Sequence, residues 1–135
     1  MSLLKNLHPR FRVERFDPAA GEADIAKLAG AFPSEIPAEY LELVREGTEV
    51  ELRVDGTRYL RIWGPKGVLD QSAGYPFRRY IPSAIPVGDD GGGNALVYMN
   101  GVRGPGLYWV DYGNIDADDA RFAAVSMRGL LVEGG

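Results

Sequence analysis

Polar and apolar residues alternate strictly between positions 49 and 54, and this alternation constrains the fold more than any other feature of the chain. A period of two is typical of a β-strand with one buried face. The Asp55-Gly56 pair that follows predicts a hairpin turn. A slip of one residue in the pairing would move every apolar side chain of this hairpin to the wrong face. The polar positions are Glu49, Glu51 and Arg53, and the apolar positions are Val50, Leu52 and Val54.

Two loop lengths are compatible with Asp55-Gly56, and they place different residues in the core. A two-residue loop would pair Leu52 with Tyr59 and put the apolar residues of the second strand on the charged face. A three-residue loop from Val54 to Gly56 puts the same residues on the core side. We therefore predict a type I turn with a glycine bulge at Gly56. The predicted pairs are Val50 with Leu60, Thr48 with Ile62, Arg53 with Thr57 and Glu49 with Arg61.

Two helices are predicted before this hairpin. The first begins at Asp17-Pro18 and is stopped by Pro33, because aspartate caps free amides and proline suits the first helical turn. The second begins at Ile36 and ends at Gly47. The inward-facing residues are Ile25, Leu28, Ala29 and Phe32 in the first helix, and Tyr40, Leu41 and Val44 in the second.

Short strands are predicted after the hairpin. Residues 95–99 are apolar on both faces, as in a central strand, and residues 107–112 form an antiparallel return. Pro82 and Pro86 flank a short strand that must lie at a sheet edge or at a strand end, because proline cannot donate to a ladder. The remaining predictions are a loop or short helix at 65–74, no assignment at 75–82, a strand at Ala123 and Ala124, and a last helix capped by Ser126.

The segment from Gly88 to Asn94 holds two adjacent acids followed by three glycines. Glycine lacks a Cβ and allows backbone angles and close approaches that other residues do not. The segment is interpreted first as a structural loop, and second as a partner contact through Asp89 and Asp90. A metal or ligand site is the third alternative, but EF-hand spacing is absent and Asn94 stands where a phosphate-binding loop has lysine. The structural glycines are Gly56, Gly88, Gly91, Gly92 and Gly93.

Composition limits the chemistry available to the chain. It has 135 residues, 45% of them apolar, and a net charge of -4, which disfavours nucleic acid as a partner. The absence of cysteine excludes disulfides and thiol chemistry and suits a reducing cytoplasm. His8 is the only histidine and has no triad or ligand partner near it in sequence, so we predict no catalytic residue, metal or cofactor. No signal peptide or membrane-spanning segment is expected.

Acidic and aromatic residues supply the candidate partner-binding positions. Asp111 opens an acidic run that is interpreted as the approach to a helix, whose dipole favours carboxylates at its N-terminus. A basic protein surface could dock on the same run. Tyr75 and Tyr80 are the aromatic residues most expected to be exposed, and tyrosine is enriched at binding hot spots. The candidate partner-binding residues are Tyr75, Tyr80, Asp89, Asp90, Asp116, Asp118 and Asp119.

The order of these motifs resembles the SUKH superfamily, which includes yeast cell-wall-assembly regulators and bacterial immunity proteins. The similarity covers about residues 20–132. Met127 and Leu130 stand where the family usually has aromatic residues, and Glu46-Gly47-Thr48 lacks the common Asn-Gly-Gly. The matching segments are Ile36-Pro37-Ala38-Glu39-Tyr40, Leu60-Arg61-Ile62-Trp63-Gly64, the stretch from Ile85 to Gly93, and the stretch from Ala124 to Leu131.

The resemblance implies one α+β domain over residues 1–135, with helices packed on a mainly antiparallel sheet. It also implies a binding protein rather than an enzyme, namely a cytoplasmic antidote that neutralises a toxin, often a nuclease. One alternative is a regulatory or scaffold interaction domain, as the yeast relatives suggest. Another is a small-ligand-binding domain that uses residues 89–94. The identity of the protein partner and the oligomeric state have no signal in the sequence.

Overall fold

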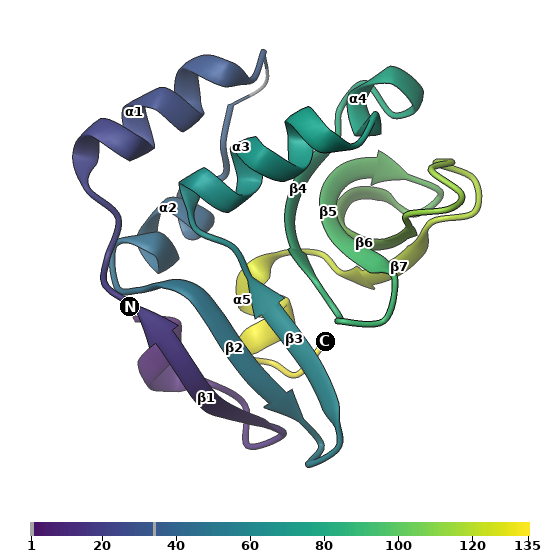
Figure 1. The fold of residues 1–135 in the computed structure, drawn as a ribbon. Coiled ribbons are helices and arrows are strands. Elements are labelled where there is room, and N and C mark those ends of the chain that lie inside the picture. Colours follow the sequence, from purple (N-terminus) through teal and green to yellow (C-terminus); the bar gives the residue numbers. More distant parts are fainter. Residues whose placement is uncertain (1, 34) are drawn as a thin grey trace.

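The computed structural model describes residues 2–33 and 35–135, and its centre is one antiparallel sheet of seven strands. The strands are β1 (Phe11–Asp17), β2 (Thr48–Val54), β3 (Arg58–Ile62), β4 (Ile85–Asp89), β5 (Asn94–Gly101), β6 (Gly104–Asp111) and β7 (Arg121–Ala124). They are neighbours in space in the order in which they occur in the chain. The sheet curls strongly, so that β5, β6 and β7 turn away from β1, β2 and β3 (Figure 1). The predicted α+β fold with a mainly antiparallel sheet is therefore confirmed.

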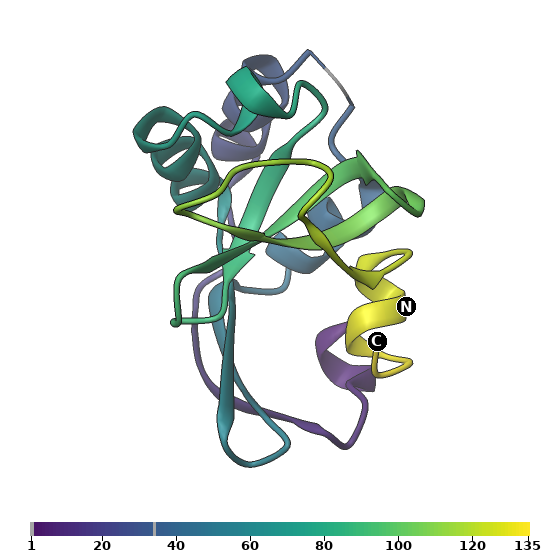
Figure 2. The same cartoon turned by 90° about the vertical axis from the view of Figure 1, so that its right-hand side faces the viewer.

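Within the described residues, five α-helices pack around this sheet. In Figure 1, α1 (Glu22–Ala31) lies beside α3 (Pro65–Gly74), and α3 packs against β4. The pair α2 (Ala38–Val44) and α5 (Met127–Leu131) are in contact with each other, and α4 (Phe77–Tyr80) follows α3. A short 3-10 turn (Leu4–Asn6) precedes β1. Figure 2 shows this N-terminal segment beside α5, where the His8 amide donates to the Leu131 carbonyl oxygen at 2.7 Å.

The sheet buries apolar side chains on both faces around β5. Leu96 and Tyr98 face a large cluster that also contains the buried residues of α1, α2 and α5. Ala95, Val97 and Met99 face a smaller cluster with Phe77 of α4 and Tyr108 of β6. A strand that is covered on both faces has a continuous run of apolar residues in its sequence. The prediction of a central strand at residues 95–99 is therefore confirmed.

The β2–β3 hairpin puts its apolar side chains in the core as predicted, but in a different register. The predicted loop is one position too early, because Val54 pairs with Arg58. Gly56 has the predicted positive φ, +80°, but Asp55 also has a φ of +53°, a combination required by a type I′ turn and not by the predicted type I turn. A shift of two residues keeps every side chain on its face, so alternation cannot distinguish these registers. The observed pairs are Val50 with Ile62, Glu51 with Arg61, Leu52 with Leu60 and Arg53 with Tyr59.

Strand β4 lies in the middle of the sheet, so its predicted position at an edge is wrong. Pro86 is its second residue, which agrees with the other prediction, a strand end. Pro86 pairs with Val97 next to a bulge that precedes Gly88. On its other side, β4 pairs with β3 only through Gly88 and Asp89. Pro86 therefore lies beyond the end of the β3 ladder and beside a bulge, where a strand tolerates proline.

The first helix begins later than predicted. Asp17 is the last residue of β1 and pairs with Thr48, and the Ala20 amide donates to the Val44 carbonyl oxygen at 2.8 Å. These contacts hold the connecting residues extended, so α1 starts at Glu22. Of the four residues predicted to face inward, Ile25, Leu28 and Phe32 are buried and Ala29 is exposed.

Local hydrogen bonds define the ends of the later helices. The helix α2 ends at Val44 rather than at Gly47, since the amides of Glu46 and Gly47 both turn back to the Leu43 carbonyl oxygen. The Ser126 hydroxyl accepts a hydrogen bond from the Gly129 amide at 2.9 Å, so the predicted cap is confirmed. The segment that had no assignment contains α4.

Two consecutive residues of α2 connect the helices to the sheet. Tyr40 is fully buried, and its hydroxyl donates to the Trp63 carbonyl oxygen at 2.7 Å. The Glu39 carboxylate accepts hydrogen bonds from the Tyr98 hydroxyl of β5 and from the Met127 amide at the start of α5, both at 2.6 Å. These two side chains therefore join α2 to the end of β3, to β5 and to α5.

We predict that Tyr40→Phe lowers the free energy of unfolding by about 1–3 kcal/mol, because it leaves the buried Trp63 carbonyl oxygen without its donor. Urea denaturation monitored by circular dichroism measures the change. The matched control is Tyr80→Phe, which removes a hydroxyl from a side chain that is 57% exposed and should leave the midpoint unchanged. Equal midpoints for the two variants would contradict the role of Tyr40.

Candidate functional site

The Asp89 carboxylate holds together the junction between β3 and β4. Its Oδ2 accepts hydrogen bonds from the Trp63 indole at 2.7 Å and from Arg61 Nε at 3.2 Å. Its Oδ1 accepts one from the Gly91 amide at 2.9 Å. The Asp89 side chain is only 13% exposed. The residue predicted to contact a partner is thus mainly occupied within the fold.

Two glycines at this junction are required by close contacts. A Cβ on Gly88 would lie 2.3 Å from the Arg61 carbonyl oxygen, so only glycine allows β4 to approach β3 here. Gly91 has a φ of +70°, and a Cβ there would lie 2.9 Å from the ring of Tyr59. The first interpretation of these residues, a structural loop, is consistent with both contacts.

Residues 89–94, the glycine loop, use their own amides to bind their own acids. Asp90 Oδ1 accepts hydrogen bonds from the amides of Gly92 and Asn94 at 2.8 and 3.1 Å, and its Oδ2 accepts one from the Asn94 side chain at 2.9 Å. Partial burial raises the pKa of Asp90, but these hydrogen bonds outweigh burial and hold the pKa below its usual value. Because the amides of Gly91, Gly92 and Asn94 already have acceptors, they are not free to cradle a phosphate.

An aromatic cluster brings the end of α3 to the loop that follows β6. The rings of Tyr75 and Tyr112 lie 4.6 Å apart, and both contact Phe77 of α4. Tyr75 is 43% exposed, as predicted. The Tyr112 amide donates to the Gly93 carbonyl oxygen at 3.0 Å, which ties the cluster to the glycine loop. Tyr112 is absent from the predicted set, because it reads as the end of a strand and only the fold places it beside Tyr75.

The acidic run lies in the loop of residues 112–120 rather than before a helix. The next element is β7, so the prediction that a helix dipole favours these acids is wrong. Asp116 instead accepts a hydrogen bond from the Asp118 amide at 2.9 Å, and Asp119 accepts one from the Asn114 side chain at 2.9 Å. Ile115 and Ala117 of the same loop pack on the cluster that contains Phe77. We define the acidic–aromatic surface as Tyr75, Tyr112, Asp111, Asp116, Asp118 and Asp119.

Tyr80 is the exposed aromatic residue that the structure does not join to this surface. Its side chain is 57% exposed, and its one ring contact among the described residues is with the Arg79 guanidinium, 5.7 Å from the ring centroid. His8 Nδ1 accepts a hydrogen bond from the Arg10 amide at 3.1 Å, and its side chain is partly buried.

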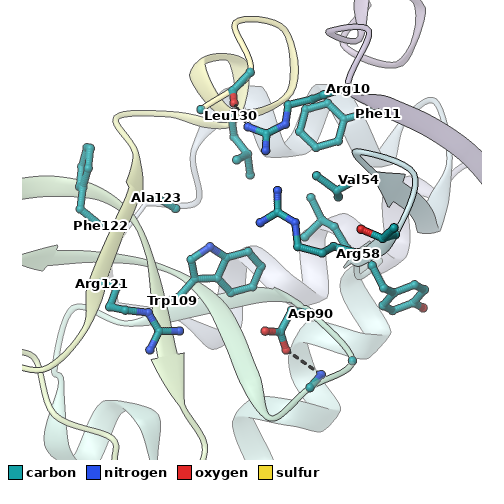
Figure 3. Close-up of a pocket in the computed structure, with 17 residues that line it drawn as sticks. Arg10, Phe11, Val54, Arg58, Asp90, Trp109, Arg121, Phe122, Ala123 and Leu130 are labelled. Atoms are coloured by element: carbon teal, nitrogen blue, oxygen red, sulfur yellow. Dashed lines mark hydrogen bonds between the residues drawn. The ribbon is translucent and has the colours of Figure 1, made fainter.

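A second candidate site is a groove of about 650 Å³ between β3 and the edge strand β7. We call it the basic groove and define it by Arg10, Arg58, Arg121 and Trp109. In Figure 3, the side chains of Arg58 and Trp109 point into the groove from β3 and β6, and Arg121 lies beside the indole. The glycine loop forms one rim through Asp90, Gly91 and Gly92.

Tyr59 is also part of the wall of the basic groove. Its hydroxyl donates to Glu51 Oε1 at 2.8 Å, and burial together with this hydrogen bond raises the pKa of Tyr59 to about 12. The phenol is therefore neutral at physiological pH. Sequence patterning does not identify the groove, because its three arginines are far apart in the chain. Arg10 lies just before β1, Arg58 in β3 and Arg121 in β7.

Within residues 2–33 and 35–135, no group of three or more His, Asp or Glu side chains is arranged to hold a metal ion. None of the helices in the described part of the chain has the length and apolar character needed to cross a membrane.

No protein-family model matches the sequence, and no curated protein is significantly similar to it. The SUKH resemblance therefore stays a prediction.

We predict that Asp89→Asn lowers the free energy of unfolding by about 1.5–3 kcal/mol, since hydrogen bonds to a charged group are lost or reversed at the β3–β4 junction. Urea denaturation measures the loss. Asp118→Asn is the control, because the Asp118 side chain forms no hydrogen bond with any described residue. Unchanged stability of Asp89→Asn would show that the junction does not depend on this carboxylate.

The depressed pKa of Asp90 predicts a specific acid sensitivity. Because the pKa in the folded state lies below the usual value of 3.8, ionised Asp90 stabilises the fold above that value, and the stabilisation is lost as the pH falls through the folded pKa. Below about pH 4, the free energy of unfolding should therefore fall more steeply for the wild type than for Asp90→Asn. Urea titrations over a pH series give the two slopes, and parallel slopes would contradict the prediction.

Proposed function

We propose that this chain is a non-catalytic protein-binding domain that neutralises a cognate toxin by covering a basic surface of it. The observation that carries the proposal is the 4.6 Å contact between Tyr75 and Tyr112, which joins an exposed aromatic side chain to the loop that holds Asp116, Asp118 and Asp119. An exposed aromatic ring and exposed carboxylates therefore lie on one surface, which supports the proposal.

The two kinds of residue have different physical roles in such a complex. Exposed carboxylates speed association with a basic partner, and salt weakens their effect because charges are screened over about 8 Å at physiological ionic strength. A packed tyrosine loses little side-chain entropy on binding, since its ring is already held by neighbours. Tyr75 therefore suits a contact that slows dissociation, and Asp118 suits one that speeds association.

The SUKH resemblance supports the immunity role within this proposal. The bacterial members of that superfamily act in the cytoplasm against toxins, often nucleases. The net charge of -4 of this chain is complementary to the basic surface of a nucleic-acid-binding toxin domain. The small-ligand alternative has less support, because the amides of the glycine loop are engaged by Asp89 and Asp90.

A regulatory or scaffold domain is the second candidate, and the basic groove favours it. Trp109 in the groove packs on the large apolar cluster, whereas Tyr112 packs on the smaller cluster across the β5–β6 ladder. Two surfaces of opposite charge on opposite faces would allow two partners to bind at once.

Co-expression of this chain with each product of the genes that flank its own tests the immunity role, and the expected result is restored growth of a host that one of these products kills as a toxin. In kinetics with that toxin, Asp118→Lys should slow association by about tenfold at low salt, and Tyr75→Ala should speed dissociation by about tenfold or more. Surface plasmon resonance at low and high salt separates the two rates.

Matched controls are available in α1 and β1, outside the acidic–aromatic surface. Asp24→Lys in α1 makes the same charge change, and Phe16→Ala in β1 removes an aromatic ring that is 52% exposed. Both controls should leave the rates unchanged. Failure to restore growth contradicts the immunity role, whereas binding that is indifferent to Asp118→Lys and Tyr75→Ala shows that another surface is used.

A further inference from the structure

We propose that the basic groove binds an acidic peptide segment of a protein partner in an extended conformation. The proposal does not depend on the toxin-binding role, because the groove and the acidic–aromatic surface lie on opposite faces of the β5–β6 ladder. The occupant follows from the charge of the groove, the strand edges that form its walls, and its apolar floor.

The groove has more positive charge than its own carboxylates neutralise. Arg10 and Arg58 share a single carboxylate, since each guanidinium lies 2.6 Å from Asp55 Oδ2. The hydrogen bonds from Arg10 and Arg58 hold the pKa of Asp55 below its usual value, so this one negative charge is already committed to both. The Arg121 guanidinium forms no ion pair or hydrogen bond with any residue in the described ranges.

The acid at the rim does not offset this excess. Both oxygens of Asp90 are turned to the amides and side chain of the glycine loop, where they accept hydrogen bonds from Gly92 and Asn94. The Arg121 guanidinium and the Nε and Nη1 groups of Arg58, which do not contact Asp55, therefore remain available to carboxylates of a ligand, for which arginine offers a planar, bidentate donor set.

The walls of the groove are strand edges. Pairing between β3 and β4 stops at Arg61, so Tyr59 and Leu60 continue beyond the ladder. Opposite them, β7 is the last strand of the sheet, and Ala123 lines the groove. The register of the β6–β7 ladder shifts between Phe122 and Ala124, so Ala123 lies at a bulge of this last strand.

An open strand edge recognises an extended peptide through main-chain hydrogen bonds, and adjacent pockets select its alternate side chains. In the groove, Arg58 and Arg121 would select acidic side chains, while Trp109, Leu60 and Leu130 provide an apolar floor for the intervening ones. A phosphate or a nucleotide would use the arginines but would leave both strand edges unused.

The test uses the full chain and a peptide library with glutamate fixed at alternate positions and the other positions randomised. A library with glutamine in place of glutamate is its control. Binding is followed by the indole N–H signals of the two tryptophans in a ¹H–¹⁵N spectrum. Trp109 lies in the groove and its signal should shift, whereas Trp63 is buried and bonded to Asp89, and its signal should stay in place.

The variants Arg58→Gln and Arg121→Gln should each weaken peptide binding by about tenfold. Arg12→Gln, on a side chain of β1 that is 75% exposed and outside the groove, makes the same charge change and should have no effect. Tyr75→Ala should also leave peptide binding unchanged, because Tyr75 lies outside the groove. The peptide-binding proposal and the toxin-binding proposal can therefore fail independently of each other. Arg121→Gln removes no hydrogen bond or ion pair within the described fold, so we expect the stability of this variant to match that of the wild type.

Three outcomes would overturn the proposal. The first is that no member of the glutamate library binds at millimolar concentration. The second is that the peptide binds Arg121→Gln as tightly as the wild type, or shifts neither indole signal. The third is that inorganic phosphate or ATP shifts the Trp109 signal and displaces the peptide, which would identify a site for small anions.

Discussion

The short ladder between β3 and β4 is the constraint on which the rest of the structure depends. It consists of two residue pairs, and it exists because Gly88 lets the two backbones approach and Asp89 binds the side chains of Arg61 and Trp63 across the junction. Trp63 is also held from the other side, because its carbonyl oxygen accepts the Tyr40 hydroxyl. Trp63, which follows β3, therefore connects α2 through its carbonyl oxygen and β4 through its indole.

This junction also shapes both candidate surfaces. Since β4 leaves β3 after so few pairs, the sheet divides, and the basic groove opens between β3 and β7. The glycine loop that follows Asp89 forms the rim of the groove, and through Gly93 it holds Tyr112 on the other face. A substitution that alters the conformation of this loop would therefore change both the groove and the acidic–aromatic surface.

The acids of the chain differ in what they bind. Asp89, Asp90 and Glu39 are engaged by amides, hydroxyls and an indole of the fold. Asp118 has no such contact in the described ranges and is exposed to solvent. Net charge alone does not separate a carboxylate that is enclosed by the fold, such as Asp89, from an exposed one such as Asp118.

Sequence patterning by itself determined which residues face the core in the β2–β3 hairpin, the central place of residues 95–99 and the cap at Ser126, because these depend on local periodicity and local hydrogen bonds. The hairpin register was decided only by tertiary pairing, since a shift of two residues preserves every face. The central position of β4 was likewise hidden by Pro86, whose missing donor is harmless only because β3 ends before it. Arg10, Arg58 and Arg121 become one site solely because the curled sheet brings distant strands to the same groove, and no spacing along the chain encodes that meeting.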